Sequence, residues 1–118
     1  YIDSIAFVAA EAAYSNAQEW HSDLITYLRS NKNLLVERIN NIEGLSLKGP
    51  EAGFLAWIDC SNSGLKNPFD FFVKEAKVGV YDGAWFGDKN YVRLNFGCPK
   101  SVLEEALDRI EKAFSQRN

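Results

Sequence analysis

The residue best suited to chemistry in this sequence is Arg93, in the stretch YVRLNF. Apolar and polar residues alternate from Tyr91 to Phe96, which predicts a half-buried strand with Arg93 on its polar face. A strand holds an arginine on a stiff backbone, and the planar guanidinium can donate two parallel hydrogen bonds to one carboxylate. The strand therefore predicts a carboxylate-binding site. The alternative is that Arg93 pairs with an aspartate or glutamate at the domain surface.

Aromatic residues precede this strand in a loop framed by two glycines. Trp85 and Phe86 lie between Gly83 and Gly87. Large aromatic side chains are costly to leave in water, so we expect them to cover something. They either cap the core of the domain itself or line a pocket beside Arg93.

Composition predicts one globular domain. The chain has 118 residues, of which 47% are hydrophobic and 25% charged, enough for a sizeable core. A net charge of -3 argues against nucleic-acid binding, which usually needs a clustered basic surface. We expect no signal peptide and no membrane partner, because no apolar run is long enough to span a bilayer.

The cysteines and the histidine do not predict a metal site. Cys60 and Cys98 are far apart, and His21 is the only histidine, so a zinc site would have too few ligands. We expect reduced, structural cysteines and a cytoplasmic protein.

The sequence contains no methionine. A translated chain begins with one, so we expect Tyr1 not to be a native start and the chain to be a piece of a longer protein.

Two helices are predicted in residues 1–43. The first spans residues 2–13, with Asp3 or Ser4 as its cap, and its apolar character on nearly all sides predicts burial against a partner. The second spans residues 17–41, after a bend at residues 14–16. Its start is predicted from a capping pair, Asn16 with Glu19, and its apolar residues fall on one face.

An α+β core is predicted in residues 44–118. The expected strands are residues 45–48, 54–59 and 91–96. Both faces of the second strand are apolar, which predicts cover on two sides. Asn67 and Pro68 predict a helix start, and that helix should run to about Lys77 and stop at Gly79.

The last helix is predicted from a capping box, Ser101 with Glu104. Its exposed face should carry the i,i+4 ion pairs Glu105–Arg109 and Asp108–Lys112. The predicted fold is therefore an α+β domain, with a small sheet of about three strands and helices packed mainly on one face.

Several motifs together resemble a known family. GAWFG, YVRLNFGCP and LEEALDRIEKAF, preceded by AEAAYSNAQEW, ITYLRSNKNLL and GFLAWID, resemble the C-terminal end of the class I/II aminotransferases. These are pyridoxal 5′-phosphate (PLP) enzymes of fold type I, and the resemblance is strongest to the MalY/PatB branch of cystathionine β-lyases, or C-S lyases. It covers nearly the whole chain.

The resemblance implies that residues 1–118 are the small C-terminal domain of such an enzyme. In that family a lysine of the large domain forms a Schiff base with PLP, so it implies no catalytic or cofactor-binding residue here and an inactive isolated chain. It places the binding of the substrate α-carboxylate on Arg93, with Trp85, Phe86 and Tyr81 lining the substrate pocket. It also implies two partners, the large domain and a second subunit of a homodimer. Many aminotransferases have a proline where this chain has Asp82, a departure that leans towards the lyase branch.

Three functions stay open at this point. The first is the substrate-binding domain of a C-S β-lyase, which converts an amino acid to pyruvate, ammonia and a thiol. The second is the same domain of an aminotransferase. The third is a non-catalytic module that only folds or dimerises.

Overall fold

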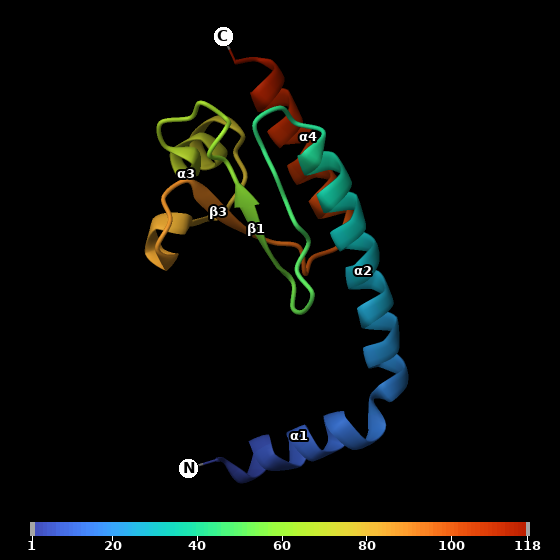
Figure 1. Cartoon of the computed structure of the whole chain (residues 1–118). Coiled ribbons are helices and arrows are strands. Elements are labelled where there is room, and N and C mark those ends of the chain that lie inside the picture. Colours follow the sequence, from blue (N-terminus) through green and yellow to red (C-terminus); the bar gives the residue numbers. More distant parts are fainter. Residues whose placement is uncertain (1, 118) are drawn as a thin grey trace.

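A three-stranded sheet is covered on one face by two long helices, and a third helix projects away from both. The computed structural model describes residues 2–117. In Figure 1, α2 (Gln18–Asn40) and α4 (Lys100–Ser115) lie next to each other on the right of the sheet, whereas α1 (Ser4–Asn16) leaves the N-terminal end of α2 at an angle. The molecule is elongated, with extents of 55 × 30 × 22 Å. The predicted α+β fold, with helices mainly on one face, is confirmed.

The strand that carries Arg93 is the centre of the sheet. The strand order is β1-β3-β2, with both pairings antiparallel. The strands are β1 (Leu55–Asp59), β2 (Tyr81–Asp82) and β3 (Tyr91–Asn95). Trp57 of β1 and Tyr81 of β2 are both in register with Arg93. Residues directly opposite each other in neighbouring strands project to the same face, so these three side chains form a row across the sheet.

The other face of the sheet is the core. Val92 and Leu94 of β3 are buried against the apolar faces of α2 and α4, as the alternation in the sequence predicts. Arg38 of α2 fastens the two helices together, because it pairs with Asp108 and Glu111 of α4 at 2.6 Å each. The predicted pair of Asp108 with Lys112 is therefore wrong, whereas the pair of Glu105 with Arg109 is confirmed.

One of the three predicted strands is misplaced. Residues 45–48 form no strand, only a single bridge between Ser46 and Asp59. The side chain of Asn40 accepts a hydrogen bond from the N–H of Leu47 at 2.9 Å and donates one to its carbonyl at 3.0 Å. These backbone groups are therefore not available to a neighbouring strand. The third strand is instead Tyr81–Asp82, which is too short to be recognised from its pattern.

The helix starts are partly as predicted. Asp3 caps α1 by accepting a hydrogen bond from the backbone N–H of Ile5. The capping pair of Asn16 with Glu19 is wrong, because Asn16 is the last residue of α1 and the bend lies at Ala17. The capping box at Ser101 is also wrong. Here α4 begins two residues after Cys98, with Pro99 as a cap that makes no side-chain hydrogen bond.

The helix after Asn67 is irregular. Asn67 caps α3 (Pro68–Asp70), as predicted. The chain then widens into a π-helical turn, η1 (Phe71–Glu75). The helical segment ends at Glu75, two residues before the predicted Lys77, and Lys77 takes the left-handed conformation with φ 57°.

The first helix has no cover within residues 2–117. None of its residues is buried, and Ile5, Phe7 and Val8 are 79%, 63% and 64% exposed. The outer face of β1 is open as well, at Leu55 and Trp57. The cover predicted for both elements is therefore not supplied by the part of the chain that the structure describes. Exposed apolar surface of this kind usually marks a contact with another protein or domain.

We therefore expect the isolated chain to self-associate and to bind a hydrophobic dye. The double substitution Ile5→Glu, Phe7→Glu should reduce both effects, because it places charge on the apolar surface of α1. Sedimentation and dye fluorescence measure the change, and Ser15→Glu on the same helix is the matched control. A wild-type chain that sediments as a strict monomer and leaves the dye dark would contradict the expectation.

Candidate functional site

The candidate site is the guanidinium of Arg93 on the open face of the sheet, with the aromatic rings around it. Its Cζ lies 4.1 Å from the ring centroid of Phe86 and 4.8 Å from that of Tyr81. Both distances are typical of a cation–π contact. Two of the three aromatic residues predicted to line the pocket therefore contact Arg93 directly.

No acidic side chain among residues 2–117 forms an ion pair with Arg93. Its Nε is buried and has no hydrogen-bond partner in the same part of the chain. The alternative, in which Arg93 pairs with a surface carboxylate of this domain, is thus not what the structure shows. Because arginine stays charged at any physiological pH, the group is a cation without a counter-ion from these residues.

The loop before β3 places Phe86 against Arg93. It forms a 3-10 turn, η2 (Gly83–Phe86), and the side chain of Asp82 caps that turn by accepting a hydrogen bond from the N–H of Ala84 at 2.9 Å. Gly83 is packed so closely that a Cβ there would lie 2.3 Å from two backbone oxygens. Gly87 ends the turn with φ 104°, a conformation that favours glycine. The two framing glycines and Asp82 therefore have structural roles in this loop.

Trp85 lies further out than predicted. It is 66% exposed, and its ring neighbours are Tyr81 at 6.1 Å and Phe69 at 6.2 Å. No cation–π contact joins Trp85 to Arg93. Of the predicted site residues, Trp85 is therefore a neighbour of the site rather than a contact of the cation.

Sequence reasoning missed Trp57, which lies beside the site. The ring of Trp57 meets Phe86 edge to face, with centroids 6.1 Å apart and planes at 85°, and stacks on Tyr91 at 5.0 Å and 11°. The alternation in β1 places Trp57 away from the core, but only the register of β1 on β3 shows that it stands opposite Arg93.

A hydrogen bond holds Tyr91, the ring on which Trp57 stacks. The hydroxyl of Tyr91 donates to Asp59 at 3.0 Å. Hydrogen bonds from Ser61, and then that of Tyr91, hold the pKa of Asp59 below its usual value, whereas the bond to Asp59 raises the pKa of Tyr91. At neutral pH the pair is therefore an anionic carboxylate that accepts from a neutral phenol.

These residues can bind and orient an anion, but they are not equipped to act as a nucleophile. Cys60 follows β1 directly, but it is buried, and burial raises the pKa of its thiol to about 12. A thiol with so high a pKa stays protonated and is a poor nucleophile. Among residues 2–117, no cluster of three or more histidine, cysteine or acidic side chains could hold a metal ion.

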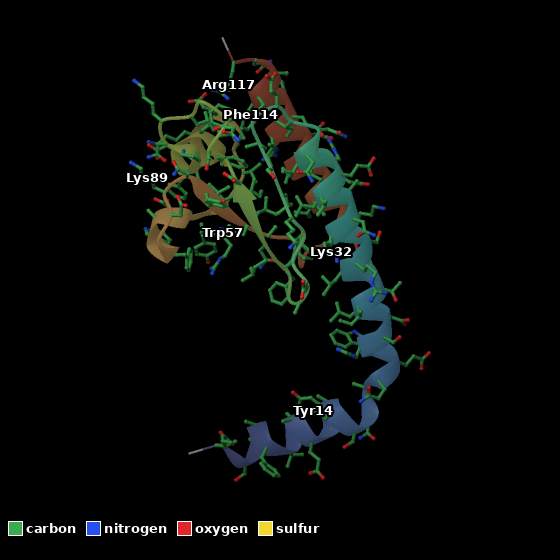
Figure 2. All side chains as sticks on the ribbon, viewed as in Figure 1. Tyr14, Lys32, Trp57, Lys89, Phe114 and Arg117 are labelled. Atoms are coloured by element: carbon green, nitrogen blue, oxygen red, sulfur yellow. The ribbon has the colours of Figure 1, made fainter. Side chains whose placement is uncertain are left out.

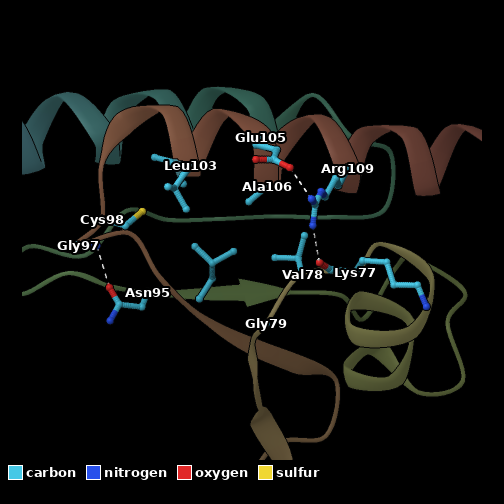
Figure 3. Close-up of a pocket in the computed structure, with 12 residues that line it drawn as sticks. Lys77, Val78, Gly79, Asn95, Gly97, Cys98, Leu103, Glu105, Ala106 and Arg109 are labelled. Carbon is cyan, nitrogen blue, oxygen red and sulfur yellow. Dashed lines mark hydrogen bonds and ion pairs between the residues drawn. The ribbon is translucent and has the colours of Figure 1, made fainter.

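A cleft lies between α4 and the sheet (Figure 3), and none of the predicted site residues lines it. Its arginine, Arg109, is already engaged, because it donates to the carbonyl of Lys77 at 3.2 Å and pairs with Glu105. The cleft is therefore a weaker candidate for anion binding than Arg93.

The lysines of this chain lie mostly at the surface. Seven of the eight lysines are exposed, and Lys32 is half-buried. None of the lysines in the described range stacks on the rings that surround Arg93. No helix between residues 2 and 117 has the length and apolarity to traverse a membrane.

Known proteins are similar to this chain in sequence and in fold. The family model described as aminotransferase class I and II matches residues 1–110. Cystathionine beta-lyase PatB of Bacillus subtilis is 32% identical over 119 residues, covering 97% of this chain and 31% of its own length. The crystal structure of OvoB matches with a TM-score of 0.95 and 42% identity, covering 100% of this chain and 31% of that one. A PLP-bound putative aminotransferase from Clostridium difficile matches with a TM-score of 0.85 and 37% identity, covering 95% and 30%.

The match extends over nearly all of the chain and includes the strand and loop that build the arginine site. The chain spans about a third of the length of these relatives, 31% for PatB and OvoB. The chain therefore belongs to the class I and II aminotransferase family.

Proposed function

We propose that this chain is the substrate-carboxylate-binding small domain of a PLP-dependent C-S β-lyase of the cystathionine β-lyase type. Arg93 binds the α-carboxylate of the amino-acid substrate. The observation that carries the proposal is the unpaired guanidinium: Arg93 lies within cation–π distance of two rings on the outer face of the sheet, without an ion pair from residues 2–117. An unpaired arginine in a partly apolar setting is suited to bind a planar anion.

The surroundings of Arg93 suit the binding of a single carboxylate in one orientation. The Cζ of Arg93 lies over the rings of Phe86 and Tyr81, and its N–H groups form no ion pair with residues 2–117, so they are available to a carboxylate. Two hydrogen bonds from these groups fix the orientation of the carboxylate and therefore of the substrate Cα, and orientation of this kind supplies much of the rate of an enzyme. Phe86 and Tyr81, with Trp85 at the outer edge, line the substrate pocket.

The chemistry belongs to the part of the enzyme outside this chain. In this proposal residues 1–43 lead into the domain and residues 44–118 form its α+β core. The uncovered α1 and the open face of β1 pack against the large PLP-binding domain or a second subunit of a cytoplasmic homodimer. This assignment accounts for the exposure of Ile5, Phe7 and Leu55.

A β-lyase is favoured over an aminotransferase because two curated relatives at 30% identity or more, PatB of Bacillus subtilis and an enzyme of Corynebacterium glutamicum, are named cystathionine beta-lyases. The aminotransferase is the second candidate, supported by the match to the PLP-bound putative aminotransferase. Arg93 would have the same role in both, because the amino acid and the keto acid each carry a carboxylate.

Product analysis of the full-length enzyme tests the proposal. With cystathionine as the substrate, we expect pyruvate, ammonia and a thiol in equal amounts, without any added keto acid. Turnover that requires a keto acid and releases no ammonia would favour the aminotransferase. The 118-residue chain alone, incubated with PLP and cystathionine, should give no turnover, and borohydride should trap no stoichiometric cofactor on a lysine. Turnover by the isolated chain would contradict the assignment of the chemistry to the rest of the enzyme.

A further inference from the structure

The orientation of Arg93 rests on its aromatic neighbours. Its Nε is buried without a hydrogen-bond partner from residues 2–117, so no polar contact of this atom fixes the rotation of the guanidinium. The contacts that remain are the two rings, at 4.1 Å for Phe86 and 4.8 Å for Tyr81. A contact that fixes the ring of Phe86 therefore also restricts the orientation of the guanidinium.

Phe86 needs support, because it lies at the end of a short turn and is 48% exposed. Trp57 provides it. The edge-to-face contact of the two rings comes from different elements, since Trp57 is on β1 and Phe86 is on the loop before β3. Aromatic pairs in this geometry stabilise by more than the area they bury.

Trp57 is itself held in place. Its ring stacks on Tyr91, whose hydroxyl donates to Asp59. Its backbone is fixed by the strand register, which places it opposite Arg93. Figure 2 shows Trp57 on the side of the sheet that faces away from α2 and α4. The contacts thus run from a strand-anchored tryptophan through Phe86 to the guanidinium.

We propose that Trp57 is a positioning residue for the carboxylate arginine, acting through Phe86. This inference rests on the proposed function, because it assumes that Arg93 binds the substrate carboxylate. Trp57 holds the Phe86 ring against the guanidinium, so that the N–H groups of Arg93 are already in place before a carboxylate arrives. Such pre-organisation strengthens binding by reducing the conformational freedom that is lost on association.

A double-mutant cycle in the full-length, cofactor-loaded enzyme tests the inference. The probe is 2-methylalanine, which carries a carboxylate but no hydrogen on Cα and therefore binds without proton removal. Its partner is isopropylamine, which has a hydrogen in place of the carboxylate, so its Kd is taken from the initial absorbance change, before that hydrogen can be removed. The Kd of each is measured from the change in cofactor absorbance, so the readout does not depend on turnover.

We expect Trp57→Ala to weaken 2-methylalanine by about 3- to 10-fold, the size of an aromatic contact converted to a ratio of binding constants. Isopropylamine should change by less than about twofold, because it does not use Arg93. In an Arg93→Ala background, Trp57→Ala should have no further effect on 2-methylalanine. Trp57→Phe keeps a ring against Phe86 and should stay close to wild type, whereas Trp57→Leu keeps apolar bulk without a ring and should behave like Trp57→Ala.

Trp20→Ala is the control for loss of a tryptophan elsewhere, on α2, and should leave both Kd values unchanged. The inference is overturned if Trp57→Ala weakens both probes equally, or if its effect persists when Arg93 is alanine. If Trp57→Ala does not fold, Trp57→Leu decides the matter by the same comparison. If Arg93→Ala alone leaves the Kd of 2-methylalanine unchanged, the proposed function is wrong and this inference fails with it.

Discussion

Replacing Arg93 with alanine in the full-length enzyme should lower kcat/KM by an amount equivalent to about 3 to 5 kcal/mol of transition-state stabilisation. The substitution removes a charge-assisted pair of hydrogen bonds to the substrate carboxylate at a site that the large domain is expected to desolvate. Arg93→Lys should restore only part of the loss, because an ammonium cannot reproduce the planar fork. Steady-state kinetics of the two variants measure both effects.

Arg109→Ala is the matched control for this experiment. Arg109 is paired with Glu105 on the exposed face of α4, and an exposed ion pair contributes less than about 1 kcal/mol. Its kcat/KM should stay near the wild-type value. A kcat/KM for Arg93→Ala within a few-fold of wild type would remove Arg93 from the substrate site.

A second large effect is expected at Asn31, a fully buried polar residue of α2. Its Nδ2 donates to the carbonyls of Phe96 and Cys98, at 3.1 and 2.9 Å, which ties α2 to the turn between β3 and α4. Asn31→Asp replaces this donor with a carboxylate oxygen facing two carbonyl oxygens. We expect a loss of about 3 to 5 kcal/mol in the free energy of unfolding at neutral pH, the cost of a buried charge without a partner. Denaturant unfolding measures it.

The loss should shrink as the pH falls. Burial and the neighbouring carbonyls raise the pKa of the introduced carboxyl in the folded state. A group with a raised folded pKa contributes stability below its unfolded pKa and loses it as the pH rises through the folded pKa. In acid the protonated carboxyl can also donate to one of the two carbonyls. The difference in free energy of unfolding between Asn31→Asp and wild type should therefore be smaller in acid than at neutral pH.

Asn40→Asp is the control on the same helix. Asn40 lies at the exposed end of α2, and its Oδ1 accepts from the N–H of Leu47, a bond that a carboxylate can keep. The loss should be about 1 kcal/mol, that of the single bond from Nδ2. Equal losses for the two variants, or a deficit for Asn31→Asp that does not change with pH, would contradict this account.

The elements with a clear period were predictable from the sequence. Alternation in YVRLNF predicts β3 with Val92 and Leu94 buried, and the structure confirms it. Long-range contacts were not predictable in the same way. The side chain of Asn40 hydrogen-bonds to the backbone of Leu47, where a strand was predicted. Asp108 pairs with Arg38 of α2 and not with Lys112 of its own helix.

The site was predictable as far as local pattern reaches. Arg93 follows from the strand pattern, and Phe86 and Tyr81 precede it in the sequence, so their contact with the cation could be anticipated. Trp57 lies 36 residues from Arg93 in sequence, and only the pairing of β1 with β3 brings the two together. A half-exposed tryptophan on the outer face of a strand gives no sign of this pairing until the sheet order is known.

The measurement that tests the central claim most directly compares the Kd of 2-methylalanine with that of isopropylamine in wild-type and Arg93→Ala enzyme. If Arg93 binds the α-carboxylate, the substitution should weaken 2-methylalanine by at least about 100-fold, equivalent to about 2.8 kcal/mol. It should leave isopropylamine, which has no carboxylate, within about twofold of wild type. Equal weakening of both ligands, or no weakening of either, would contradict the assignment of the carboxylate to Arg93.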